Sequence, residues 1–185
     1  ELARTYARYQ ELMAREGAID FGDQIVLALR LLLARPHVLN AYQRRFRYIL
    51  VDEFQDTNVA QFALVKLLAA RHGNLAVVAD DDQSIYKWRG AAISNVLGFL
   101  DRYPTTRQIV LADNYRSHQA ILDAAYRLIV HNNPDRLEVK HGISKQLRAV
   151  KEPPGPELAH LHYESATQEA DAVTAIIRVR IDAGA

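Results

Sequence analysis

The most informative segment of this sequence is Phe46-Arg-Tyr-Ile-Leu-Val-Asp-Glu-Phe-Gln-Asp-Thr-Asn58. Its residues Tyr48 to Val51 form a short apolar, β-prone run that ends abruptly in the carboxylates Asp52 and Glu53. This pattern is typical of a buried parallel strand that delivers acidic groups to its carboxyl end. If the strand continues through both acids, their side chains point to opposite faces. One acid can then hold a metal ion while the other acts on a water molecule.

Two further strand patterns along the chain also end in polar residues. They cover residues 75–79, before Asp80, Asp81 and Asp82, and residues 107–111, before Asp113 and Asn114. Helical patterns follow the three strands at residues 58–71, 94–103 and 117–132. This alternation predicts the α/β class, with a parallel sheet, right-handed crossovers and flanking helices. Chemically active groups then belong outside the carboxyl ends of the strands, where all three polar runs lie.

The remaining segments predict additional helices at both ends of the chain. Helices are expected at residues 1–16, 21–34 and 39–45, the second of them capped by Asp20. Asn58 with Gln61, and Ser165 with Gln168, have the spacing of capping boxes. Residues 151–156 contain three prolines and a glycine, which indicates a boundary. An edge strand at 158–163 and a last helix are expected after it.

Composition limits the classes of function. The 185 residues are 49% hydrophobic, which favours a folded protein. Cysteine is absent, so disulfides and thiol chemistry are excluded, in keeping with a cytoplasmic localisation. No apolar run reaches membrane-spanning length, and we expect no membrane partner. The net charge of +1 predicts that any contact with DNA is local, through aromatic rings and a few arginines.

Three segments resemble motifs of the UvrD/Rep-type superfamily 1 DNA helicases, in the order and spacing of that family. Val51-Asp-Glu-Phe-Gln-Asp-Thr-Asn58 resembles the second motif, and Val78-Ala-Asp-Asp-Asp-Gln-Ser-Ile-Tyr-Lys-Trp-Arg-Gly-Ala91 the third. Leu111-Ala-Asp-Asn-Tyr-Arg-Ser117 resembles the fourth. The resemblance implies part of a RecA-like sheet of the P-loop NTPase type. It also implies ATP-driven movement on single-stranded DNA and duplex unwinding, in the 3′-to-5′ direction.

The resemblance also implies roles for five residues at an ATP and Mg²⁺ site. Asp52 would hold the Mg²⁺, a hard cation that suits carboxylate oxygens. Glu53 would orient and activate the attacking water. Gln83 would sense the γ-phosphate and link nucleotide state to the grip on DNA. Tyr115 would lie against the adenine, and the fixed cationic fork of Arg116 would contact the γ-phosphate.

The third motif supplies most of the residues expected to bind DNA. Tyr86 and Trp88 alternate, so they lie on one side if the segment is extended. Bases stack on such rings in a sequence-independent way. Arg89 belongs to the same group, and Phe21 matches a family aromatic residue near the same strand path. Single-stranded DNA and duplex junctions are therefore the expected partners.

Three positions depart from the family's motifs, and several family motifs are missing. The departures are Ala79 and Lys87, where glycine is usual, and Asp113, where glutamine is common. None of the eight glycines is followed by lysine, so the phosphate-binding loop is absent, as are the fifth and sixth motifs. We therefore expect an interior helicase fragment that alone does not turn over ATP.

By resemblance, the fragment divides into three parts. Residues 1–19 would end an inserted helical subdomain, 20–116 would belong to the first RecA-like motor domain, and 117–185 would begin the second. The strand that carries the phosphate-binding loop would normally lie inside the sheet. Without it, unpaired strand edges are expected to cause rearrangement, self-association or poor solubility.

Two other classes of function fit parts of the sequence. A metal-dependent nuclease could use Asp52, Glu53 and residues 80–82 as a two-metal cluster. A non-catalytic module that binds single-stranded DNA or a protein would explain the missing phosphate-binding loop. His160 and His162 share one face of the expected edge strand, but they have no third ligand nearby in sequence and do not indicate a metal site.

Overall fold

The computed structural model describes residues 1–151 and 158–184, except for the side chain of Arg89. The chain forms two compact units. Unit 1 contains residues 1–110 and 132–144, and unit 2 contains 111–131 and 145–185. The chain therefore leaves unit 1 after residue 110, returns to it at 132 and leaves it again after 144.

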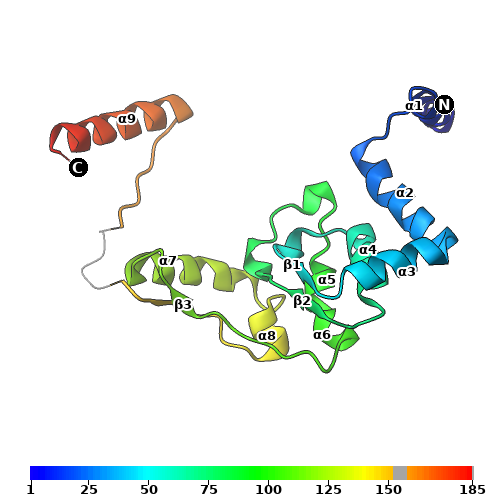
Figure 1. Cartoon of the computed structure of the whole chain (residues 1–185). Helices are drawn as coiled ribbons and strands as arrows, with labels where there is room; N and C mark the ends of the chain where they lie inside the picture. The colour runs from blue at the N-terminus through cyan, green and yellow to red at the C-terminus, as the bar shows by residue number, and fades with distance from the viewer. Residues whose placement is uncertain (152–157, 185) are drawn as a thin grey trace. The chain divides into compact units, whose positions relative to one another are not determined.

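Three helices open unit 1, and they form largely where the sequence predicts them (Figure 1). They are α1 (Leu2–Arg15), α2 (Phe21–Ala34) and α3 (Pro36–Arg45). Asp20 caps α2 as predicted, because its Oδ1 accepts a hydrogen bond of 2.8 Å from the backbone N of Asp23. The third helix begins at Pro36, earlier than expected, since proline is well suited to the first turn of a helix.

A parallel pair of strands lies at the centre of unit 1. In it, β1 (Ile49–Val51) pairs with β2 (Leu75–Val77), with Ile49 opposite Leu75. The two strands are connected through α4 (Val59–Ala69). The predicted capping box at the start of α4 is confirmed: Asn58 Oδ1 accepts from Gln61 N at 2.8 Å, and Gln61 Oε1 accepts from Asn58 N at 2.9 Å.

The core of unit 1 is a cluster of four buried apolar side chains, Phe54, Phe62, Val96 and Phe99. The rings of Phe62 and Phe99 meet that of Phe54 edge-on, at centroid distances of 5.0 and 5.5 Å. Phe99 lies in α6 (Phe99–Arg102), which follows α5 (Ile93–Leu97). The single helix predicted over 94–103 is therefore interrupted at Gly98, a residue with low helix propensity. Because Phe54 directly follows the acidic end of β1, this core also anchors that end.

Residues 132–144 belong to unit 1, although residues of unit 2 flank them on both sides in the sequence. They begin with Asn132, the last residue of a 3₁₀ turn at Val130–Asn132, and include α8 (Leu137–His141). Leu137 packs against the Phe54 core, and His141 Nε2 lies 3.2 Å from Leu97 O. Leu137 thus fixes the segment to the core of unit 1, beside Phe54 and the carboxyl end of β1.

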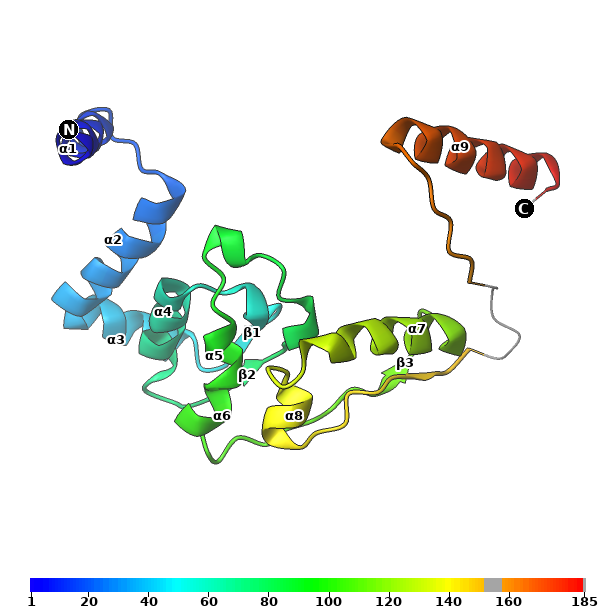
Figure 2. The same ribbon diagram turned by 180° about the vertical axis from the view of Figure 1, so that it is seen from behind.

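Unit 2 contains a second, smaller parallel pair of strands, β3 (Asp113–Asn114) and β4 (Arg148–Ala149). Its helices are α7 (Gln119–Ile129) and α9 (Ala166–Asp182) (Figure 2). Half of the capping box expected at α9 forms: the Ser165 side chain accepts from Gln168 N at 3.3 Å, but Gln168 Oε1 accepts from Glu164 N at 3.2 Å.

The α/β class is confirmed, but the strands form two two-stranded sheets within the described residues. The strands predicted at 107–111 and 158–163 do not form. A strand requires a partner for its backbone groups, and Ile109 and Leu111 remain 69% and 76% exposed. A β-prone pattern is therefore not sufficient at either position.

Among the described residues, no single helix is long and apolar enough to cross a membrane. The helices α2 and α3 reach the necessary length and apolarity only as a pair, which is bent by 107°.

Candidate functional site

The two acids at the end of β1 lie on a tight backbone turn. The strand stops at Val51, so the expectation that Asp52 and Glu53 continue it with opposite facing is wrong. Glu53 instead adopts the left-handed conformation, with φ 49° and ψ 41°, and its N donates to Asp52 Oδ1 at 2.9 Å. Such a conformation costs about 1–3 kcal/mol for a residue other than glycine and needs support from its surroundings. Here Phe54 supplies it, since its side chain is fully buried and its N donates to Val78 O at 2.9 Å.

Gln55 joins the acidic ends of the two strands. Only 1% of this residue is exposed. Its Nε2 donates to Glu53 Oε2 at 2.6 Å, and its Oε1 accepts from Asp80 N at 3.1 Å. One amide can do both because it carries a donor and an acceptor on the same planar group. No role for Gln55 is predicted from the sequence, where its only signal is an amide two residues after Glu53.

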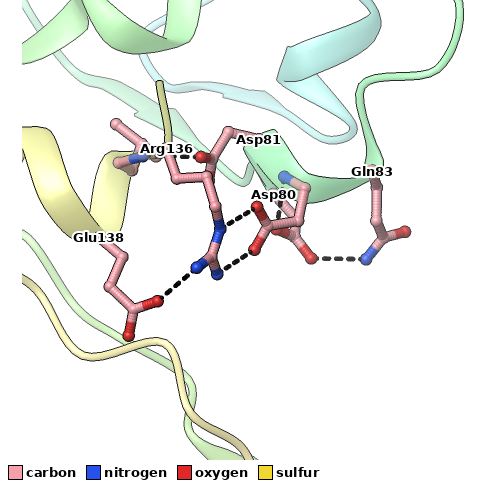
Figure 3. A network of polar contacts seen from close by, with 7 residues as sticks. Asp80, Asp81, Gln83, Arg136 and Glu138 are labelled. Atoms are coloured by element: carbon pink, nitrogen blue, oxygen red, sulfur yellow. Dashed lines mark hydrogen bonds and ion pairs between the residues drawn. The ribbon is translucent and has the colours of Figure 1, made fainter. Parts of the chain in front are cut away.

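A 3₁₀ turn, Asp81–Gln83, follows β2, and Asp80 caps it. Asp80 Oδ1 accepts from Asp82 N at 3.1 Å. Asp80 Oδ2 accepts from the Gln83 side-chain Nε2 at 2.8 Å (Figure 3). Asp80 therefore sets both the shape of the turn and the direction of the Gln83 amide.

Arg136, from the segment 132–144, pairs with one acid of this turn. Its Nε and Nη2 donate to the two carboxylate oxygens of Asp82, each at 2.7 Å, and its Nη1 lies 2.8 Å from Glu138 Oε2 (Figure 3). The hydrogen bonding of the Arg136 guanidinium to the Asp82 carboxylate is the main reason that the pKa of Arg136 is raised above its ordinary value. The next residue contributes as well, because Leu137 N donates to Asp81 Oδ2 at 2.7 Å. Sequence reasoning missed Arg136, which lies 54 positions from Asp82 and outside every motif.

These contacts decide which acids suit a metal ion. The carboxylates of Asp80, Asp81 and Asp82 come within 4.8 Å of one another, but Arg136 and Leu137 engage two of the three. The two-metal cluster proposed for a nuclease would therefore share two of its carboxylates with these partners. Asp52, in contrast, is exposed and uses Oδ1 for the neighbouring backbone N. A single carboxylate of this kind fits Mg²⁺, which keeps several of its waters.

The predicted DNA-binding aromatics of unit 1 are exposed. Tyr86 and Trp88 are 38% and 74% exposed, with ring centroids 6.4 Å apart and planes inclined by 58°. Their segment is not extended, because Lys87–Arg89 forms a 3₁₀ turn that ends at Gly90 with φ 85°. Phe21, the first residue of α2, is 88% exposed. The side chain of Arg89 lies outside the part of the structure that is described.

The predicted adenine and phosphate contacts lie in unit 2, on a turn after β3. Asn114 Oδ1 accepts from the backbone N of Arg116 at 3.0 Å and of Ser117 at 2.8 Å. This turn leaves Tyr115 74% exposed and Arg116 exposed as well. Next to it, Arg148 donates to Asp113 Oδ1 through Nη2 at 2.6 Å and through Nε at 3.0 Å.

Comparison with known proteins identifies relatives of this chain. The UvrD/REP helicase N-terminal domain family matches residues 1–104. An ATP-dependent DNA helicase PcrA from Leuconostoc citreum is 48% identical over 149 residues, which are 79% of this chain and 20% of that protein. Proteins of the same name from Staphylococcus epidermidis and Staphylococcus aureus are each 50% identical over 132 residues, 71% of this chain and 18% of theirs. The chain thus spans about a fifth of the length of these relatives.

Proposed function

Because the chain belongs to the UvrD/REP helicase family, we propose that it forms part of an ATP-driven DNA motor. In this proposal, the chain links ATP hydrolysis to the grip on single-stranded DNA during duplex unwinding. Movement is 3′ to 5′, duplex junctions are bound as well, and the protein acts in the cytoplasm. Residues 1–19, 20–116 and 117–185 correspond to the inserted subdomain and to parts of a first and a second RecA-like domain.

A path of three hydrogen bonds that crosses Asp80 carries the proposal. It runs from the Glu53 carboxylate through the buried Gln55 amide to the backbone N of Asp80, and from the side-chain Oδ2 of Asp80 to the Gln83 amide. Its links measure 2.6, 3.1 and 2.8 Å. Gln83 lies only a few residues before the exposed rings of Tyr86 and Trp88. A shift of Gln83 can therefore reach the carboxylate that acts on water, and the reverse also holds.

The residues of unit 1 suit the hydrolytic part of this function. We assign Asp52 to a Mg²⁺ ion, which when bound would neutralise the charge that develops on the phosphate oxygens. Glu53 is the general base: Gln55 holds its Oε2, and its Oε1 is the oxygen that we assign to the attacking water. The supported left-handed backbone keeps this carboxylate in one place, which matters because phosphoryl transfer depends mainly on positioning.

The remaining residues bind the substrate and the DNA. Tyr86 and Trp88 stack on bases, an interaction worth about 1–3 kcal/mol for each base. Arg89 and Phe21 contribute to the same DNA surface. In unit 2, Tyr115 lies against the adenine, and Arg116 contacts the γ-phosphate.

Three substitutions in the full-length protein test these roles. Glu53→Gln keeps the shape but loses the base, so hydrolysis collapses while ATP and DNA still bind. Trp88→Ala weakens single-strand affinity about tenfold or more and uncouples hydrolysis from unwinding, without changing ATP binding in the absence of DNA. Gln83→Ala binds both ligands but responds weakly to DNA.

The measurements are ATP affinity, single-strand affinity and hydrolysis with and without DNA. Tyr48→Ala is the matched control for Trp88→Ala, because Tyr48 is 81% exposed but lies outside the proposed DNA surface. If Trp88→Ala binds single strands as tightly as the parent protein, the stacking role is wrong.

The chain by itself is proposed to be inactive and prone to self-association. It has no glycine followed by lysine, so it lacks a loop to cradle the phosphates. Leu50 on β1 is 70% exposed, which leaves apolar strand surface uncovered. Steady phosphate release by the 185-residue chain, lost in Glu53→Gln, would contradict the first statement, and a clean monomer in light scattering the second.

A further inference from the structure

Arg136 has the features of a residue that holds the acidic turn in shape. It is 2% exposed, and its side chain bonds to Asp82 with both prongs of the guanidinium fork. A two-pronged contact fixes the orientation of the carboxylate as well as its charge. Because Asp82 lies between Asp80 and Gln83 in the sequence, its orientation affects both neighbours.

The turn is held at a second point by the same segment. Leu137 N donates to Asp81 Oδ2 at 2.7 Å, and the Leu137 side chain packs against the Phe54 core. Two successive residues of 132–144 therefore bind two successive acids of the turn. A segment anchored in the core cannot follow the turn if the turn changes shape.

The Arg136 guanidinium also affects which carboxylate accepts a hydrogen bond from the Gln83 amide. Both oxygens of Asp82 face Arg136, whereas Asp80 Oδ2 accepts from Gln83 Nε2 and Asp80 O accepts from Gln83 N at 3.0 Å. Without the cation, three neighbouring carboxylates would repel one another, and Asp82 could compete for the amide.

We propose that Arg136 is a positioning residue for Gln83: by holding both oxygens of Asp82, it keeps the 81–83 turn in the shape in which Asp80 orients the Gln83 amide. The inference rests on the proposed role of Gln83 in linking DNA binding to hydrolysis. It adds to that role a residue from a distant segment that is not among those assigned to ATP or DNA.

The experiment uses the full-length protein, ATP with Mg²⁺ and an oligothymidine strand. The key variant is Arg136→Lys, which keeps the positive charge and loses the planar fork. Gln83→Ala, the double variant, and Arg8→Lys as a control complete the set. Arg8 forms an exposed pair with Glu11 in α1 and lies far from the turn in sequence. Hydrolysis with and without DNA, strand affinity and thermal unfolding are measured for each.

We expect Arg136→Lys to lower DNA-stimulated hydrolysis about tenfold, as for loss of a charged hydrogen-bonded contact, with unstimulated hydrolysis and strand affinity within about twofold of the parent. The double variant should lose no more stimulation than Gln83→Ala alone, because both changes act through one side chain. Arg8→Lys should match the parent.

Additive losses in the double variant, or equal loss of stimulated and unstimulated hydrolysis, would overturn the inference. If Arg136→Lys does not fold, Asp82→Asn, which disrupts the same fork from the other side, is judged by the same criteria. If both variants unfold, the role of the Arg136–Asp82 pair is purely structural, and the inference is overturned as well. Normal DNA stimulation in Gln83→Ala would instead overturn the proposed role of Gln83 itself.

Discussion

Each unit of this protein contains an arginine–aspartate pair beside a short parallel strand, with Asp82 in the turn after β2 and Asp113 as the first residue of β3, but the two pairs lie in different environments. In unit 1, the side chains of Arg136 and Asp82 are 3% and 15% exposed. In unit 2, those of Arg148 and Asp113 are 78% and 43% exposed. Both arginines use Nε and Nη2, and the shortest contacts, 2.7 and 2.6 Å, are nearly equal.

The difference shows that contact distance alone does not determine what an ion pair does. An exposed pair is screened by water and contributes little to stability. A buried pair need not stabilise the fold more than apolar residues would, but removing one partner leaves an unpaired buried charge. The Asp82 turn therefore depends on Arg136, whereas the turn that displays Tyr115 and Arg116 is held by Asn114 and depends little on Arg148.

The largest effect is expected from Arg136→Met, which breaks the buried pair. It should lower the free energy of unfolding of unit 1 by about 3–5 kcal/mol, because Asp82 keeps its charge and loses the buried cation that holds both of its oxygens. Urea unfolding of the 185-residue chain measures this loss. Faster hydrogen exchange at Leu137 N would locate it at the turn. A loss below about 1 kcal/mol would mean that the pair behaves like an exposed one.

The next effect is expected from Gln55→Leu, which tests whether the buried amide is needed between the two strand ends. The change keeps a similar volume but leaves Glu53 Oε2 and Asp80 N without this partner, at a cost of about 1–3 kcal/mol. Hydrogen exchange at Asp80 N should become faster. Gln24→Leu is the control, because Gln24 is an exposed glutamine on α2. Equal stability of the two variants would contradict the bridging role.

A smaller effect is expected from Arg148→Met in unit 2. The exposed pair with Asp113 should contribute about 0–1 kcal/mol, and less at high salt. Urea unfolding at low and high salt, in parallel with Arg136→Met, gives the direct contrast. A cost for Arg148→Met as large as that for Arg136→Met would remove the distinction between the two pairs.

The smallest effect concerns an exposed pair without an arginine, Tyr9 and Asp20, whose hydroxyl–carboxylate bond of 3.0 Å joins α1 to α2. Hydrogen bonds from Asp23 N and from Tyr9 lower the pKa of Asp20 below its ordinary value. The contribution of Asp20 to stability is therefore present above the ordinary pKa of aspartate and is lost as the pH falls through the lowered pKa. The hydrogen bond to Asp20 raises the pKa of Tyr9. The contribution of Tyr9 to stability is therefore complete below the ordinary pKa of tyrosine and is lost as the pH rises through the raised pKa.

Protection of α1 against hydrogen exchange, taken relative to the intrinsic exchange rate at each pH, should accordingly be greatest between these two limits and decrease at acid and at strongly alkaline pH. Tyr9→Phe should remove the alkaline change and weaken the acid one. Tyr42→Phe serves as the control, because Tyr42 is an exposed tyrosine on α3. If Tyr9→Phe keeps the change at strongly alkaline pH, a group other than Tyr9 causes that change.

Local sequence signals predicted the helix ends well. Asp20 caps α2 and Asn58 with Gln61 caps α4, because the partners are three residues apart and need no distant contact. The strand expected at 107–111 failed for the opposite reason. Its apolar pattern was correct for a strand, but pairing depends on a second segment, which no pattern within residues 107–111 can supply.

By itself, the sequence determined the α/β class, the family and the acids and aromatic rings that mark the candidate site, because these depend on residue types at short spacing. Only the tertiary structure revealed three features. They are the left-handed conformation of Glu53, the hydrogen bonds of the buried Gln55 amide to Glu53 and Asp80, and the two-pronged bond of Arg136 to Asp82. Gln55 lies 25 residues from Asp80, and Arg136 lies 54 from Asp82. Such partners meet only when the core forms and excludes water, and burial is what makes these polar contacts costly to remove.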